Sequence, residues 1–161
     1  MPIIHIQVPP LVTAISGNPS VHPPADNLHL NGPTVQVTVT VSQDIAAQLT
    51  QAGHPAPTPV AGTDLIDTGA SSTCIDDAIA QQLGLPVIDV VQMSSASHAS
   101  TPANIYPLQV AIAGLPMSFN AQRAMVAELQ SKGIILLLGH DLLRFCTLHY
   151  NGFSIEFTPA I

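Results

Sequence analysis

Charged and aromatic residues are scarce in this sequence of 161 residues. Only 8% are charged and 4% are aromatic, and tryptophan is absent. Three residues are basic, Arg123, Lys132 and Arg144, and the formal net charge is −7. A chain with so few cations cannot neutralise a row of phosphates, so we expect neither nucleic-acid binding nor attachment to an anionic membrane surface.

Long apolar runs are missing as well. None approaches the roughly 20 residues that a membrane-spanning helix needs. The start of the chain, MPIIHIQVPPLV, contains no lysine or arginine and interrupts its apolar stretch with prolines, which makes it a poor signal peptide. We therefore expect a cytoplasmic protein.

Cysteine is too rare to build a disulfide framework, since the chain has only Cys74 and Cys146. Two buried thiols in a reducing compartment are the favoured interpretation, and a single disulfide bond is the alternative. The seven histidines show no spacing typical of metal ligands, so we expect no metal and no other cofactor.

Aliphatic residues and turn formers dominate instead. Hydrophobic residues make up 47% of the chain, and 15 prolines and 10 glycines punctuate it. This composition predicts one mainly β domain with one or two short helices. Residues 1–33, rich in proline and asparagine, read as an N-terminal extension that resembles an arm or linker, although its apolar start could add an edge strand. We expect the folded domain to span residues 34–161.

Periodicity and turn signals predict the elements of that domain. From Thr34 to Val41, valines alternate with polar residues, which is typical of a half-buried strand. A second strand over 60–66 leads directly into the sequence DTGASS. Capping residues, glycines and prolines mark the ends of further segments. These are short helices over 42–53, 76–84 and 141–146, a hairpin over 87–93 and 105–112 with a polar tip, a buried strand over 134–139, and a final hairpin over 146–157.

The segment LIDTGAS, residues 65–71, delivers one carboxylate from an apolar strand into a tight loop. Gly69 lets the backbone approach closely, and the Thr68 hydroxyl can both donate and accept a hydrogen bond. Peptide hydrolysis by carboxylates alone needs two of them sharing a proton, one as base on water and one as donor to the carbonyl oxygen. Because the chain has one such loop, the second carboxylate would have to come from a second copy.

These residues resemble the active-site signature of the retropepsins, the aspartic proteases of retroviruses and their cellular and bacterial relatives. ILLLGHDLL, residues 135–143, resembles the second signature of the same family, an apolar run followed by glycine, any residue, aspartate or asparagine, and apolar residues. The likeness covers roughly Thr34 to Phe157. It implies a retropepsin-like acid protease barrel, a homodimer, and an endopeptidase that hydrolyses peptide or protein substrates with a dyad of Asp67 from two chains.

The resemblance also implies individual roles. Asp67 would be the catalytic carboxylate, Thr68 would hydrogen-bond the opposite loop, and Gly69 would steady the carboxylate and contact substrate. Substrate would lie on a cleft floor and under a flap. The cleft floor would include Ala70, Ser71 and Ser72, and the flap tip would consist of Met93, Ser94, Ser95, Ala96, Ser97 and His98.

The chain departs from the retroviral pattern at two places. Where retroviral enzymes commonly pair an arginine with a carboxylate, this chain has His140 and Ser71, and its flap tip contains no glycine. These departures are the reason to keep an alternative function open beside the protease, a catalytically weak protease-fold module for peptide binding or dimerisation. A third possibility is an enzyme that becomes active only when residues 1–33 move or are removed.

Two further aspartates call for an explanation. Asp64 is a charged residue in a strand expected to be buried, so it needs a partner, exposure to solvent or a raised pKa. We expect Asp141 to brace the loop or to cap the following helix and not to act as the second acid.

Overall fold

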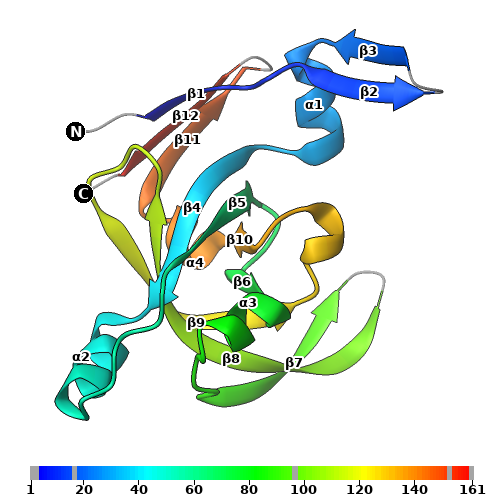
Figure 1. Cartoon of the computed structure of the whole chain (residues 1–161). Helices are drawn as coiled ribbons and strands as arrows, with labels where there is room; N and C mark the ends of the chain where they lie inside the picture. The colour runs from blue at the N-terminus through cyan, green and yellow to red at the C-terminus, as the bar shows by residue number, and fades with distance from the viewer. Residues whose placement is uncertain (1–3, 16–17, 96–97, 152–153, 160–161) are drawn as a thin grey trace.

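The computed structural model describes residues 4–15, 18–95, 98–151 and 154–159 (Figure 1). Within these residues, six strands form a closed barrel in which the last strand pairs with the first. In spatial order they are β4 (Thr34–Val41), β5 (Val60–Ile66), β10 (Leu136–Leu138), β6 (Cys74–Asp76), β9 (Ser118–Ala127) and β8 (His98–Ile112). A seventh strand, β7 (Asp89–Ser95), pairs with β8 as a hairpin. The predicted mainly β barrel is confirmed.

A parallel pair brings two distant segments of the barrel together. β5 and β10 run side by side, with Asp64 opposite Leu136 and Ile66 opposite Leu138. β10 also pairs with β6, which itself lies parallel to β9. The β5–β10 pair places the end of β5 beside the end of β10, so the loops that follow both strands meet at the same edge of the sheet.

Aliphatic side chains fill the barrel. The four valines of β4 are buried as their alternation predicts, with Val39 completely excluded from solvent. Leu108 and Val110 of β8 and Leu136 of β10 are equally inaccessible. Burying an aliphatic side chain of this size stabilises the fold by roughly 1.5–3 kcal/mol. The core therefore rests on valine, isoleucine and leucine, in keeping with the low aromatic content.

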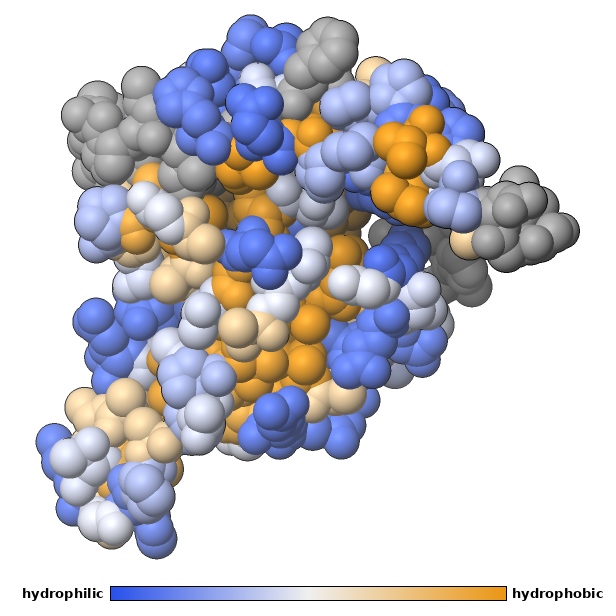
Figure 2. All heavy atoms as spheres, turned by 45° about the horizontal axis from the view of Figure 1, so that its top comes forward, coloured by the Kyte–Doolittle hydropathy of each residue, from blue (hydrophilic) through white to orange (hydrophobic). Residues whose placement is uncertain are grey.

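Four short α-helices occur in the described residues, where the composition predicts one or two and the local signals predict three. α2 (Gln43–Gln51) is capped by the Ser42 side chain and projects from the barrel (Figures 1 and 2). α3 (Asp77–Gln82) is capped by Asp76, which accepts a hydrogen bond from the Ala78 N–H. The remaining two helices are α1 (Pro24–Asn31) and α4 (His140–Leu143), and a short 3₁₀ helix spans Gln130–Lys132. α1 has no fully buried residue and packs on the core through Leu28, so it lacks the repeated apolar positions that would predict a helix.

The N-terminal residues contain regular structure. β1 (Ile4–Gln7) adds to the edge of β12 (Ser154–Pro159), which pairs with β11 (Cys146–Tyr150) in a three-stranded sheet. The edge strand that the apolar start of the chain allowed is therefore present. β2 (Leu11–Ile15) and β3 (Asn18–His22) form a separate hairpin that extends away from the barrel (Figure 1). Within the described residues, no helix is long and apolar enough to cross a membrane.

The surface is uneven in polarity. Figure 2 shows a face on which apolar residues gather in the middle and hydrophilic residues lie around them. Several large apolar side chains are exposed, including those of Val12 and Val21, which sit opposite each other in the β2–β3 hairpin. Apolar atoms contribute much of the surface of any folded protein, so single exposed side chains of this kind need no special explanation.

Candidate active site

The Asp67 loop begins where β5 ends. The Ile66 N–H donates to the Pro33 carbonyl (2.9 Å), and the Asp67 N–H donates to the Leu138 carbonyl of β10 (3.0 Å). The Ala70 N–H then donates to the Asp67 carbonyl (3.2 Å), which closes a tight turn. The backbone of Asp67 is therefore held from both sides before its side chain leaves the sheet.

The Asp67 carboxylate is half-buried and receives a local hydrogen bond. Its Oδ1 accepts from the Gly69 N–H at 2.8 Å. This is the contact expected of the Gly69 backbone. Thr68 and Gly69 themselves are exposed, so the carboxylate and its flanking loop lie at the surface of the single chain.

Gly139 allows β10 and the start of α4 to pass close against the Asp67 loop. A Cβ at this position would lie 2.4 Å from the Ser72 carbonyl carbon and 2.8 Å from the Thr73 nitrogen. Next in the chain, the His140 N–H donates to the Ala70 carbonyl at 2.9 Å. The two segments that resemble family signatures are thus in direct backbone contact.

Asp141 braces the same loop from the opposite side. Its Oδ1 accepts from both the backbone N–H and the hydroxyl of Thr73, each at 2.8 Å. The buried Thr73 hydroxyl in turn accepts from the Gly139 N–H at 3.3 Å. No side chain caps α4, whose N-cap residue is Gly139. Of the two roles expected for Asp141, bracing the loop is confirmed.

Of the three explanations expected for Asp64, the structure supports a raised pKa. Its side chain is 0% exposed, and neither carboxylate oxygen has a hydrogen-bond partner among the described residues. Burial raises the pKa of this carboxyl well above its ordinary value. Partnership and exposure, the other two explanations, are absent from the part of the chain that the structure describes.

Both cysteines are free thiols that stay protonated at neutral pH. Cys74 is buried and Cys146 is half-buried. Burial raises the pKa of each thiol to about 11, and the nearby carboxylates of Asp141 and Asp67 contribute at Cys74. Because the thiolate is the nucleophilic form, neither cysteine is poised for nucleophilic catalysis.

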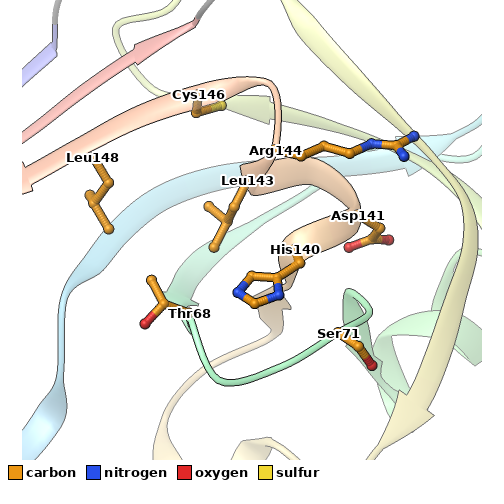
Figure 3. Close-up of a pocket in the computed structure, with 8 residues that line it drawn as sticks. All are labelled: Thr68, Ser71, His140, Asp141, Leu143, Arg144, Cys146 and Leu148. Carbon is orange, nitrogen blue, oxygen red and sulfur yellow. The ribbon is translucent and has the colours of Figure 1, made fainter.

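A pocket of about 660 Å³ opens beside the Asp67 loop (Figure 3). Its walls come from the loop, from α4 and from β11, and the His140 ring extends from α4 toward Thr68 (Figure 3). The lining residues are Thr68, Ser71, His140, Asp141, Leu143, Arg144, Cys146 and Leu148. Thr68 and Ser71 are the predicted site residues that line it.

The other predicted site residues lie elsewhere. Asp67, Gly69, Ala70 and Ser72 belong to the same loop but do not line the pocket. Met93, Ser94 and Ser95 end β7 and His98 begins β8, so the predicted hairpin is confirmed, whereas Ala96 and Ser97 lie outside the described residues. Leu143 ends the second signature segment and Leu148 lies outside both signatures, and neither was predicted as a site residue. Their place in the pocket follows only from the way β11 folds back beside α4.

Comparison with known families decides the classification. Residues 58–145 match the family model described as "gag-polyprotein putative aspartyl protease". The chain belongs to this aspartyl protease family. The match spans both signature segments, and the predicted retropepsin-like membership is confirmed. A search of curated proteins finds no match for this member of the family.

Two solved structures are similar to this aspartyl protease family member. One is a retropepsin-like aspartic protease from Rickettsia conorii, 18% identical, with a TM-score of 0.43, covering 78% of this chain and 91% of that one. The other is the retroviral protease-like domain of Ddi1 from Leishmania major, 16% identical, with a TM-score of 0.38, covering 79% of this chain and 95% of that one.

Proposed function

We propose that this protein is an aspartic endopeptidase whose catalytic dyad consists of Asp67 from two copies of the chain. The observation that carries the proposal is the placement of Asp67. Its backbone is fixed by Leu138, its carboxylate is held by the Gly69 N–H, and its loop is braced by Asp141. A preorganised carboxylate at a surface loop is suited to meet a second one across a two-fold axis.

The two carboxylates would share one proton, because like charges about 3 Å apart cannot both ionise. The ionised member would take a proton from water as the water oxygen attacks the peptide carbonyl carbon. The protonated member would donate its proton to the carbonyl oxygen. Collapse of the tetrahedral intermediate would break the C–N bond, with a proton passing to the departing amine. Since one carboxyl must stay protonated, activity should be highest in acid.

The apolar surface beside the Asp67 loop is suited to contact a second copy of the chain. Thr68 is exposed at the rim of the pocket, and Leu143 and Leu148 line its apolar part. A partner protomer seated here would cover this apolar lining and bring its own Asp67 loop toward the first. The β7–β8 hairpin would then act as a flap, with an extended peptide substrate bound as an added strand.

Peptide cleavage measured against pH tests the proposal. We expect wild type to cleave best in acid and Asp67→Asn to lose at least about 100-fold, the lower range for removing a general acid or base. Asp44→Asn is the matched control, because this exposed carboxylate lies on α2 and should leave cleavage unchanged. Undiminished cleavage by Asp67→Asn would show that the mechanism is wrong.

A mixing experiment tests whether the dyad is shared between chains. If an equal amount of Asp67→Asn is added and allowed to exchange with a fixed amount of wild type, activity should fall to about one half, because half of the wild-type chains enter inactive mixed dimers. Unchanged activity would mean that each chain acts alone. A dimer by sedimentation that neither cleaves peptide nor binds a pepstatin-type inhibitor at any pH would favour the binding or dimerisation module instead.

A further inference from the structure

Asp64 is an acid built into the wall of the barrel. In register, it lies between Val35 of β4 and Leu136 of β10. Its side chain is 0% exposed, and both carboxylate oxygens lack a hydrogen-bond partner among the described residues. Burying an ionised carboxylate without partners is among the most costly arrangements in a protein interior.

Asp76, a second buried carboxylate of the barrel, differs from Asp64 in its hydrogen bonding. Asp76 is 4% exposed, and its oxygens accept three backbone hydrogen bonds, from Ala78 at 3.0 Å, Leu129 at 2.9 Å and Gln130 at 3.0 Å. These donors replace the hydrogen bonds to water that a carboxyl group loses on burial. Asp64 has no such hydrogen-bond donors among the described residues, so its carboxyl group must be accommodated in the interior in another way.

The surroundings of Asp64 favour its neutral form. The side chains that share its face of the sheet are Val35 and Val37 from β4 and Leu136 and Leu138 from β10, and none of them titrates. No charged group of the described residues contributes to its pKa shift. The backbone N–H groups of Leu65 and Leu138 offset part of the effect of burial, but neither lies in hydrogen-bonding geometry with the carboxylate.

Asp64 belongs to the strand pair that carries Asp67. The β5–β10 ladder pairs Asp64 with Leu136 and Ile66 with Leu138. The Asp67 N–H then donates to the Leu138 carbonyl. Whatever loosens this short parallel ladder also loosens the backbone bond that fixes the catalytic candidate.

We propose that Asp64 is a proton-dependent positioning residue, which as a neutral acid lets β5 and β10 hold the Asp67 loop and on ionising weakens that hold. This goes beyond the proposed function, because it concerns how proton concentration governs the strand pair and requires no catalysis. An ionised Asp64 would draw water toward the barrel wall, since the N–H groups of Leu65 and Leu138 offset only part of the cost of burying its charge.

The sign of the effect follows from linkage. A carboxyl with a raised folded-state pKa binds its proton more tightly in the folded chain than in the unfolded chain. Its stabilising contribution is complete below the unfolded value of about 3.9 and is lost as pH rises toward the folded value. Over that window the unfolding equilibrium constant should rise about tenfold per pH unit. Above the folded pKa the loss is constant.

Urea denaturation of the full chain from pH 4 to pH 9, at fixed protein concentration, tests the proposal. Asp64→Asn keeps the shape and removes the charge, so it should lose the steep fall in stability and be more stable than wild type at neutral pH. Asp64→Val fits an interior strand and removes the polar atoms, so its stability should show the same weakened dependence on pH as that of Asp64→Asn. Asp76→Asn is the matched control. It should be less stable than wild type at neutral pH, and its stability should still fall with rising pH as steeply as that of wild type.

Amide hydrogen exchange of wild type provides a local measurement that does not depend on any variant folding. After correction for intrinsic exchange, protection of the Asp67 N–H should fall with rising pH more steeply than protection of the Val110 N–H in β8. The proposal would be overturned if protection of the Asp67 and Val110 N–H groups fell equally steeply with pH. It would also be overturned if both Asp64 variants kept the wild-type dependence of stability on pH. A loss of stability in Asp64→Asn as large as in Asp76→Asn would overturn it too. Neither experiment uses substrate, so failure of the proposed protease function would leave these results unaffected.

Discussion

Gly139→Ala offers the most direct test of how the two signature segments are joined. A Cβ on this residue would lie 2.4 and 2.5 Å from the Ser72 carbonyl carbon and oxygen, and 2.8 Å from the Thr73 nitrogen. All three are backbone atoms, which cannot rotate away as a side chain can. The loop can retreat only by stretching the hydrogen bonds from Thr73 to Asp141.

The magnitude follows from three contributions. Forcing an extra methyl group into packed structure costs about 1–3 kcal/mol. Weakening the bonds to the Asp141 carboxylate adds to this, since a hydrogen bond to a charged group contributes about 1.5–3 kcal/mol. In the opposite direction, alanine lowers the conformational entropy of the unfolded chain, which stabilises the fold by about 0.4–1 kcal/mol because the backbone at this position is extended (φ −97°, ψ −177°). We expect a net loss of about 2–4 kcal/mol in the free energy of unfolding.

Urea denaturation followed by circular dichroism measures this loss, with Gly62→Ala as the matched control. Gly62 lies in β5, also without a positive φ, and the three nearest atoms to its Cβ would be side-chain atoms of Ile135, namely Cδ1 at 2.7 Å, Cγ1 at 2.8 Å and Cγ2 at 2.9 Å. Because Ile135 is half-buried, its side chain can move outward whereas the backbone at Ser72 and Thr73 cannot, so the control should lose about 1 kcal/mol, the low end of the cost of an inserted methyl group. If both variants unfold with the same free energy, the close approach at Gly139 is not what holds the segments together.

Two further predictions concern individual contacts. Thr73→Val removes the hydroxyl that joins Asp141 to Gly139 and should lower the free energy of unfolding by about 1–3 kcal/mol. Thr73→Ser keeps the hydroxyl and should lose only the contribution of one buried methyl group, about 0.8 kcal/mol. An unchanged urea midpoint in Thr73→Val would count against the network. Arg123→Gln should raise the pKa of Asp89 toward its ordinary value, as followed by NMR titration, because the Arg123 hydrogen bond at 2.6 Å is the main cause of its lowering. The stabilising effect of this pair is present above the unfolded pKa and is lost as pH falls; an unmoved pKa would refute the assignment.

Local patterns accounted for much of the fold. The alternating valines of β4, the Ser42 cap of α2 and the hairpin of β7 and β8 all follow from neighbours in the sequence. Such features depend on side-chain period and on capping chemistry, which act over a few residues. α1 was not predicted because only Leu28 packs on the core from this helix, and a single apolar contact leaves no helical period to detect.

The sequence by itself determined that an aspartate follows an apolar strand in a DTG loop, and that a Gly-His-Asp segment comes later in the chain. Only the tertiary structure decided that Asp141 binds Thr73, 68 residues away. It also decided that Asp64 is buried without a hydrogen-bond partner among the described residues, whereas Asp76 accepts three backbone hydrogen bonds. The reason is physical, since burial and pairing of a carboxylate depend on which strands close around it. In this barrel those strands come from segments that are distant in sequence and joined by the parallel β5–β10 pair.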